Sequence, residues 1–142
     1  MRITKYNILL IILLLLTSCV KEESYKDIPI ANINVTIYPD GTEYIDLNTV
    51  GGWIYLTAPY PSKGILIYRI SSTTFMAYER TCTFDPDELD AKIIVDETYM
   101  IAKDTVCGSQ FLLTDGYPIV GPATRPLRQY RTEYDGYALR IF

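Results

Sequence analysis

The chain has 142 residues, a length that suits one compact domain and leaves little room for two. Its 17 acidic side chains outnumber the 13 basic ones, giving a formal net charge of −4, and so acidic a chain is a poor binder of nucleic-acid backbones. Because the sequence contains no histidine, it cannot build a Ser-His-Asp or Cys-His catalytic arrangement, and we expect no enzymatic activity.

Residues 1–18 have the features of a lipoprotein signal peptide. Arg2 and Lys5 precede an apolar run, Ile8 to Leu16, that is much shorter than the roughly 20 apolar residues a membrane-spanning helix needs. The run ends in Leu-Thr-Ser-Cys at residues 16–19, which is similar to the bacterial lipobox, whose cysteine is acylated and begins the mature chain. The resemblance implies cleavage before Cys19, a lipid on this cysteine and attachment to a membrane through that lipid.

Residues 19–27 are expected to form a charged tether between the lipid and the folded domain. The stretch Val-Lys-Glu-Glu-Ser after Cys19 has no apolar face, and composition alone supports only a spacer. Lys-Glu-Glu so close to the acylated cysteine resembles the surface-export signal of Bacteroidetes lipoproteins. This resemblance implies a protein of the outer membrane that is exposed on the cell surface.

From residue 28 onward the sequence predicts a single all-β domain, 28–142. Short β-branched and tyrosine-rich runs alternate with Gly, Pro and Asp-Gly turn signals, and no stretch keeps a helical period. Asp135-Gly136 predicts a two-residue hairpin turn between the last two strands. This number of short strands favours a small sandwich or barrel. The expected strands are 34–38, 44–47, 53–58, 65–71, 75–79, 92–95, 99–102, 129–134 and 137–141.

Aromatic and charged residues suggest three further interpretations. The chain has 13 tyrosines and one tryptophan, and aromatic faces stack on sugar rings, but tyrosines scattered along strands more simply suit half-buried strand positions. Asp85, Asp87, Glu88 and Asp90 offer calcium ligands without the spacing of an EF-hand loop. Three arginines between residues 125 and 131 are the only basic cluster, and we expect them to lie on a solvated strand edge.

Two loops resemble those that hold the [2Fe-2S] cluster of a Rieske domain. The first is Arg-Thr-Cys-Thr-Phe-Asp at residues 80–85, and the second is Val-Cys-Gly-Ser-Gln-Phe at residues 106–111. The resemblance covers residues 52–142 and implies a Rieske-like β-structure with both loops at one end. The family's Cys-x-x-His-Gly-Ser-x-Phe and Gly-Pro-Ala-x-x-Pro-Leu patterns are matched at Gly108, Ser109, Phe111, Gly121, Pro122, Ala123, Pro126 and Leu127.

The cluster ligands of the family are missing from this chain. In the register set by Gly108 and Ser109, the four ligand positions fall on Cys82, Phe84, Asp104 and Cys107. A second register would place the cysteine ligand on Cys107 and the histidine on Gln110, at the cost of the other matches. A Rieske centre needs two cysteines and two histidines, and an all-cysteine cluster needs four thiolates. We therefore expect no metal and no cofactor apart from the lipid on Cys19.

The resemblance implies that Cys82 and Cys107 face each other, and in an oxidising compartment we expect them to form a disulfide that replaces the cluster as a staple. Phe84 would then fill the space of an imidazole. Two alternatives stay open: a metal site of both thiolates with Asp104 or Asp85, and a redox-active thiol pair.

We accordingly expect a lipid-anchored, surface-exposed module with a Rieske-like fold that has lost its iron-sulfur ligands and serves a binding or structural role. Its partner would be an unidentified protein or glycan, and not a nucleic acid. The alternatives are an electron-transfer protein with an atypical [2Fe-2S] or other metal site, and a glycan-binding lipoprotein that uses exposed tyrosines.

Overall fold

The computed structural model describes residue 28 and residues 31–142. The expected signal peptide, the acylated Cys19 and the tether therefore lie outside the described residues, and their assignments stay predictions. No helix in the described part of the chain is long and apolar enough to cross a membrane.

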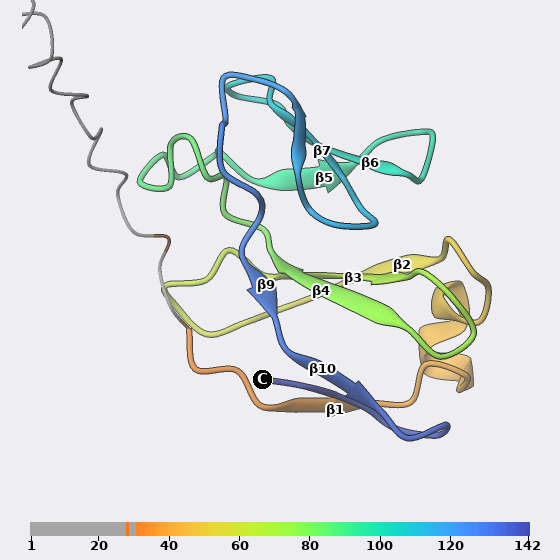
Figure 1. Cartoon of the computed structure of the whole chain (residues 1–142). Helices are drawn as coiled ribbons and strands as arrows, with labels where there is room; N and C mark the ends of the chain where they lie inside the picture. Colours follow the sequence, from red (N-terminus) through yellow and green to blue (C-terminus); the bar gives the residue numbers. More distant parts are fainter. Residues whose placement is uncertain (1–27, 29–30) are drawn as a thin grey trace, which may run out of the picture.

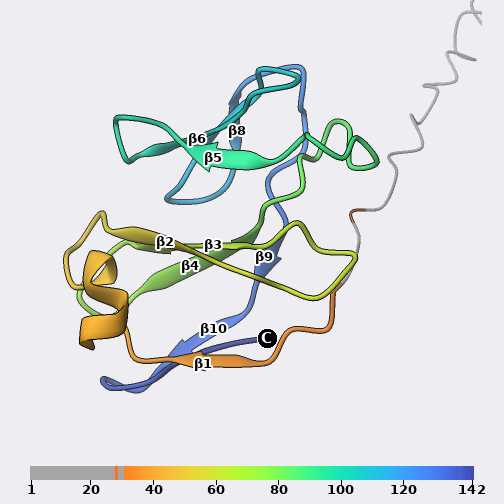
Figure 2. The ribbon, with the colours of Figure 1, turned by 180° about the vertical axis from the view of Figure 1, so that it is seen from behind.

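The domain is built from short antiparallel strands arranged in three sheets (Figures 1 and 2). The strand orders are β1-β11-β10, β2-β3-β4-β9 and β5-β6-β7-β8. One short 3-10 helix, η1, Thr42–Leu47, precedes β2. The strands are β1 Val35–Ile37, β2 Trp53–Leu56, β3 Ile65–Arg69, β4 Phe75–Glu79, β5 Ile93–Val95, β6 Ile101–Asp104, β7 Gln110–Leu112, β8 Pro118–Val120, β9 Gln129–Tyr130, β10 Thr132–Tyr134 and β11 Leu139–Ile141.

The sheet that contains β2, β3, β4 and β9 is the middle layer, and both of its faces are covered (Figure 1). Side chains alternate between the faces of a strand, so Ile65 and Ile67 pack with the β1-β11-β10 sheet while Leu66 and Tyr68 pack with the β5–β8 sheet. All five residues of β3 are buried as a result. We call the β1-β11-β10 sheet the lower layer and the β5–β8 sheet the upper layer.

The all-β fold class is confirmed, and most expected strands are present, several with shorter bounds. The strand expected at 99–102 lies at 101–104, and the one expected at 129–134 is divided into β9 and β10. The strand expected at 44–47 is wrong, because this segment forms η1, whose one buried residue is Leu47. The chain also forms β7 and β8, which the sequence did not reveal. Here Gly116, with φ of +76°, reverses the chain against the ring of Tyr78, and a Cβ atom at this position would lie 2.8 Å from that ring.

The expected two-residue hairpin at Asp135-Gly136 is wrong in length. Residues 135–138 connect β10 to β11, so the turn contains four residues. Asp135 stabilises the longer turn because its Oδ1 accepts hydrogen bonds from the backbone N–H groups of Tyr137 and Ala138, at 3.0 and 2.8 Å. The same two hydrogen bonds hold the pKa of the Asp135 carboxyl below its ordinary value.

Candidate functional site

The two loops identified in the sequence meet in the upper layer and bring four potential ligands together. These are the thiols of Cys82 and Cys107 and the carboxylates of Asp85 and Asp104, whose ligand atoms all lie within 4.8 Å of one another. We call these four residues the loop site. Cys82 and Asp104 are fully buried, whereas Asp85 and Cys107 are partly accessible.

Asp104 is held in place through one carboxylate oxygen and presents the other to the site. Its Oδ1 accepts hydrogen bonds from the backbone N–H groups of Val106 and Cys107, at 2.6 and 3.2 Å. The backbone N–H of Gly108 bonds to the Asp104 carbonyl at 3.0 Å, and Gly108 adopts a φ of +79°, which favours glycine. This closed turn fixes the direction of the Asp104 side chain and of the neighbouring thiol.

Ser109 links the second loop to the segment that follows β8. Its buried hydroxyl lies 3.1 Å from the Cys107 sulfur and accepts a hydrogen bond of 2.9 Å from the backbone N–H of Ala123. Ala123 and Leu127 are themselves buried in the core of the upper layer, together with Phe111. These residues, which the sequence patterns matched, therefore pack behind Cys107 and hold its loop in place.

Cys82 sits in a poorly solvated position. Burial raises the pKa of its thiol, the adjacent Asp104 and Cys107 side chains raise it further, and a hydrogen bond from the Phe84 backbone opposes them. A thiol held in its neutral form is a weak nucleophile, so the geometry does not favour a reactive Cys82.

Two carboxylate oxygens of the loop site have no hydrogen-bond partner. Asp85 Oδ1 and Asp104 Oδ2 are both inaccessible to solvent, and no donor of the described residues bonds to either. An unpaired buried acceptor costs about 1–3 kcal/mol, and more when it is charged. These two oxygens beside two thiols therefore lack the donor or cation that buried carboxylates normally have.

The predictions for the first loop have mixed outcomes. The Cys82 and Cys107 sulfurs face each other at 3.5 Å as thiols, which is longer than the roughly 2.05 Å of a disulfide, so the covalent bond stays a prediction. The prediction that Phe84 fills the space of an imidazole is wrong, because its side chain is 54% exposed. Asp85, the next residue, turns inward instead. Gln110, the ligand of the second register, is not part of the group.

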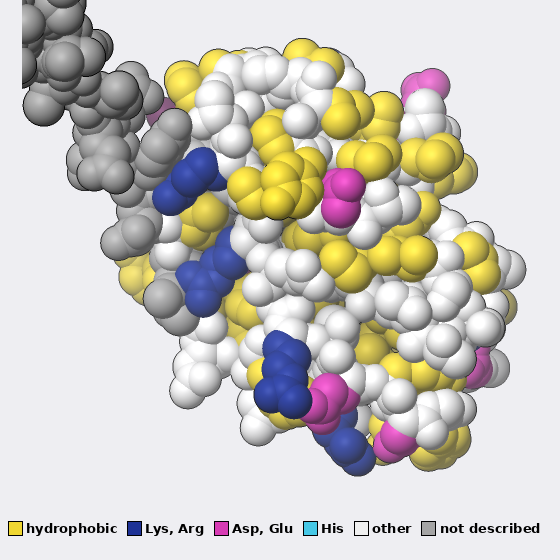
Figure 3. Space-filling view, in the orientation of Figure 1, with side chains coloured by type: hydrophobic (Ala, Val, Ile, Leu, Met, Phe, Trp, Pro, Cys, Tyr) yellow, Lys and Arg dark blue, Asp and Glu magenta, His cyan; other side chains and the backbone are white. Residues whose placement is uncertain are grey.

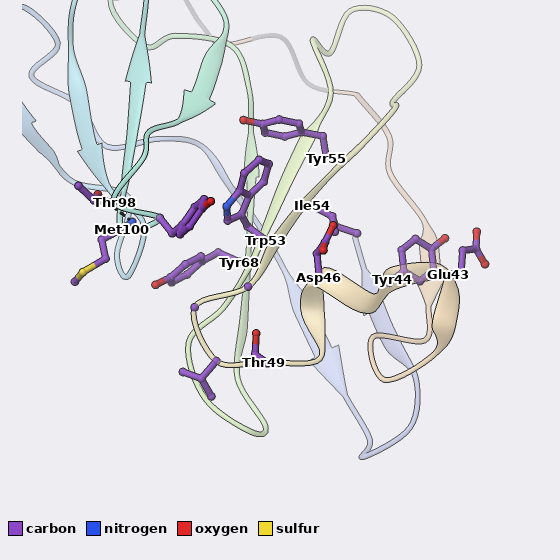
Figure 4. Close-up of a pocket in the computed structure, with 14 residues that line it drawn as sticks. Glu43, Tyr44, Asp46, Thr49, Trp53, Ile54, Tyr55, Tyr68, Thr98 and Met100 are labelled. Atoms are coloured by element: carbon purple, nitrogen blue, oxygen red, sulfur yellow. Dashed lines mark hydrogen bonds between the residues drawn. The ribbon is translucent and has the colours of Figure 1, made fainter.

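A second candidate site is a large open cleft between the middle layer, η1 and the turn that joins β5 to β6 (Figure 4). Its volume is about 920 Å³, within the range of small-molecule sites. In Figure 1 this turn and η1 lie at one end of the molecule, and the loop of residues 83–90 lies at the other. The fourteen lining residues include the aromatic side chains of Tyr44, Trp53, Tyr55, Tyr68 and Tyr99.

The strand pattern places three of these rings side by side. Trp53 and Tyr55 are two residues apart on β2 and so share a face, with ring centroids 4.9 Å apart. Tyr68 lies directly opposite Trp53 on β3. The hydroxyl of Tyr55 accepts a hydrogen bond of 2.7 Å from the backbone N–H of Val95, and the guanidinium of Arg80 lies 3.5 Å from its ring centroid. These contacts fix the wall of the cleft.

Tyr99 approaches this wall from the other layer. It has a φ of +57°, the only positive value found at a non-glycine residue in the described chain, and its side chain is 58% exposed. The turn is held by Asp96, whose Oδ1 accepts hydrogen bonds from the backbone and hydroxyl of Thr98. The Tyr99 ring centroid lies 6.3 Å from that of Trp53. A bulky residue in this backbone conformation is strained, and such strain is often stored at functional sites.

The scattered distribution of tyrosines along the sequence is therefore misleading for this part of the molecule. Four of them, from η1, β2, β3 and the β5–β6 turn, converge with the single tryptophan on one cleft. The pairing of β2 with β3 and the position of the upper layer over them produce this arrangement, and neither was visible in the sequence.

The charged clusters considered in the sequence have no comparable organisation. Of the four acidic residues between 85 and 90, only Asp85 belongs to a ligand group among the described residues. Arg131 pairs with Glu133, and Arg128 bonds to the Ile28 carbonyl at 3.4 Å. On the face shown in Figure 3, the Lys and Arg side chains form separate groups along one edge and no continuous track, while hydrophobic side chains cover much of the upper layer.

Comparisons with known proteins give a loose structural likeness. No protein-family model matches the chain, and no curated protein matches it. A chain in the complex of reduced oxygenase and oxidized ferredoxin in carbazole 1,9a-dioxygenase is 21% identical, with a TM-score of 0.46 over 64% of this chain and 81% of that one. The ferredoxin of carbazole 1,9a-dioxygenase from Nocardioides aromaticivorans IC177 is 14% identical, with a TM-score of 0.46 over 66% and 86%.

At these values the likeness establishes neither a family nor an activity for the chain. The residues themselves do not fit a Rieske cluster, because the sequence has no imidazole to bind the second iron. The four side chains of the loop site also crowd within 4.8 Å of one another, whereas a two-iron cluster divides its ligands between two metal atoms.

Proposed function

We propose that this chain is a saccharide-binding module, attached to the outer membrane by a lipid on Cys19 and exposed on the cell surface. The observation that carries this proposal is the convergence of Trp53, Tyr55, Tyr68 and Tyr99 on one cleft of about 920 Å³. Catalysis and electron transfer have no part in it. The proposal narrows the binding role expected from the sequence to one class of ligand and one site.

Aromatic side chains support a ligand with flat apolar faces. A pyranose ring presents C–H groups on its faces and hydroxyls around its edge, so it can stack on rings such as Trp53 and Tyr99. Tyr99 and Met100 are both more than half exposed, so the rim of the cleft offers apolar surface without any change in the fold. A ligand that stacks on this surface would remove apolar area from water.

The polar groups of the cleft suit the hydroxyl edge of a sugar. Glu43 and Asp46 from η1 contribute carboxylates, and Thr49 and Thr98 contribute hydroxyls. Carboxylates accept hydrogen bonds and hydroxyls both donate and accept. In Figure 4 Asp46 and Thr49 lie on the η1 side of Trp53 and Thr98 on the side of the β5–β6 turn, so polar groups flank the stacking surface. Because both charges are negative, neutral or amino sugars should bind better than acidic ones.

The single tryptophan provides a direct test. Trp53 is the only tryptophan of the chain and lines the cleft, so its fluorescence reports on this site alone. We expect glycan-array screening of the full chain to identify neutral or amino glycans, and titration with a positive glycan to shift or quench the Trp53 emission. Absence of any array signal at millimolar-range sensitivity would reject the saccharide proposal.

Matched tyrosine variants locate the binding surface. Tyr99→Ala should weaken glycan binding about 5-fold, because loss of one stacked ring costs on the order of 1 kcal/mol. Tyr117→Ala is the control, since Tyr117 has a similar exposure of 61% but lies outside the cleft. Equal loss of binding in both variants would place the glycan elsewhere.

The proposed location has its own test. Full-length protein expressed in its bacterial host should partition with the outer membrane, and Cys19→Ser should release it from that membrane. Proteinase added to intact cells should degrade the anchored protein, as expected for surface display. Survival of the protein in intact cells, with degradation only after lysis, would contradict surface exposure. It would not contradict glycan binding at the cleft.

A further inference from the structure

We propose that Cys82, Asp85, Asp104 and Cys107 form a site for one divalent transition-metal ion of the zinc type. This inference is independent of the saccharide proposal, because the loop site and the aromatic cleft share no residue. The ion would join the loop after β4 to the loop after β6 and fix the end of the upper layer.

The spacing of the four side chains fits one ion at their centre. Zinc binds thiolate sulfur at about 2.3 Å and carboxylate oxygen at about 2.0–2.2 Å, so ligand atoms on one tetrahedral ion lie roughly 3.3–3.8 Å apart. The two sulfurs are already 3.5 Å apart, and no pair of ligand atoms exceeds 4.8 Å. Small rotations of the side chains would complete the coordination, and a second metal atom has no room.

The unpaired carboxylate oxygens favour a cation over a disulfide. A bond between Cys82 and Cys107 would leave Asp85 Oδ1 and Asp104 Oδ2 buried without partners, and it would remove the thiol protons that could have bonded to them. A divalent ion instead coordinates both oxygens together with both sulfurs. On binding, the ion replaces the two thiol protons, which pass to solvent, and no electron is transferred.

The surroundings of the site resemble the support that metal ligands need. Backbone N–H groups of Val106 and Cys107 hold Asp104 through Oδ1 and leave Oδ2 for the ion. Because the Ser109 hydroxyl accepts from the backbone of Ala123, its own proton can be donated to the Cys107 thiolate, 3.1 Å away. Hydrogen bonds of this kind orient ligands and stabilise their charged form.

The donor set selects the class of metal. Two thiolates disfavour calcium and magnesium, which take oxygen ligands, and favour zinc or its spectroscopic substitute cobalt(II). Two carboxylates complete four-coordination with protein ligands, as in a structural site with no open position. The absence of histidine from the chain does not weaken this assignment, because the four ligands are already present.

Metal analysis of the full chain tests the proposal. The protein, isolated in detergent without chelator or added metal, should contain one zinc per chain, and cobalt(II) exchanged into it should give thiolate-to-cobalt absorption in the near ultraviolet. Cys107→Ser should abolish this absorption. Asp85→Asn, at a partly accessible loop position, should weaken zinc binding at least about 10-fold while the chain still folds.

Asp90→Asn is the matched control, because it removes a carboxylate from the same loop at an exposed position outside the group. It should bind zinc and cobalt like the unchanged protein. Chelator should lower the melting temperature of the unchanged protein and of Asp90→Asn, and should leave that of Cys107→Ser unaffected.

Three results would overturn the proposal. One is a Cys82–Cys107 disulfide in protein isolated without reductant, seen by mass spectrometry together with no bound metal. Another is stoichiometric iron with inorganic sulfide, which would indicate a cluster. The third is metal binding that survives both Cys107→Ser and Asp85→Asn. None of these results bears on glycan binding at the cleft, so the two proposals fail separately.

Discussion

The two layers that cover the middle sheet differ in how completely their polar groups are used. On the side of the middle layer that faces the lower layer, the buried Arg69 of β3 is bonded to Asp40, to the Leu47 carbonyl and to the carbonyls of Ser71 and Ser72. In the upper layer two buried carboxylate oxygens have no partner, and the exposed ring of Tyr99 lies at the rim of the cleft. The lower layer is thus complete as a structural support, and the upper layer carries the groups that a ligand or an ion would complete.

Leu139→Ala tests the structural role of the lower layer and should have the largest effect. Leu139 is fully buried on β11 in the core between the lower and middle layers. Truncating it removes transfer energy and leaves a cavity, so the free energy of unfolding should fall by about 2–5 kcal/mol. Urea denaturation measures the change.

The same variant also tests whether the lower layer is coupled to the loop site or to the cleft. Under conditions where Leu139→Ala is still folded, its zinc content and its glycan affinity should match those of the unchanged protein. A selective loss of either one, at full folding, would show that the lower layer is coupled to the site concerned.

Particular residues show how much of the fold and of the two candidate sites the sequence predicted. A β-branched run such as Ile65 to Arg69 was sufficient to predict a strand. The family resemblance carried by the Gly-Ser and Cys patterns was sufficient to predict that the two loops lie together. The sequence offered Asp85 only as an alternative to Asp104, because its neighbour Phe84 occupies the family position. Only the path of the folded loop decides that Asp85 points inward together with Asp104. The cleft was missed because its rings come from four separate segments.

Alkaline pH should destabilise the middle layer and its contact with the upper layer. Burial is the main cause that raises the pKa of the Tyr78 phenol, with a smaller contribution from Asp115, and its hydroxyl donates to the Leu113 carbonyl at 3.1 Å. Burial likewise raises the pKa of Tyr130, and Glu79, which accepts from its hydroxyl at 2.6 Å, adds to the shift.

A raised pKa in the folded state means that the neutral phenol is favoured by folding. Its stabilising effect is complete below the unfolded-state pKa of about 10 and is lost as pH rises from there toward the folded-state value. The free energy of unfolding should therefore fall by at least about 1 kcal/mol between pH 9 and pH 11. Urea denaturation at a series of pH values measures it.

The matched variants for this prediction are Tyr78→Phe and Tyr117→Phe. Tyr78→Phe removes a buried phenol that titrates, so the alkaline decrease should become smaller, although the variant starts from a lower stability because the Leu113 carbonyl loses its donor. Tyr117→Phe changes an exposed ring and should leave the decrease unchanged. An identical pH profile for all three proteins would mean that Tyr78 does not contribute.

The smallest expected effect on stability is also the sharpest test of the strained turn in the upper layer. Tyr99 holds a φ of +57°, which costs a residue with a side chain about 1–2 kcal/mol relative to glycine. Tyr99→Gly relieves this strain while it removes a ring that lies 6.3 Å from Trp53. Because the exposed ring contributes little packing, the variant should be more stable by about 1 kcal/mol and yet bind glycan more weakly.

Tyr99→Ala removes the same ring without relieving the strain, so it should lose binding with no gain in melting temperature. If Tyr99→Gly gains stability and keeps full affinity, the strain serves no ligand and the cleft is not the binding site.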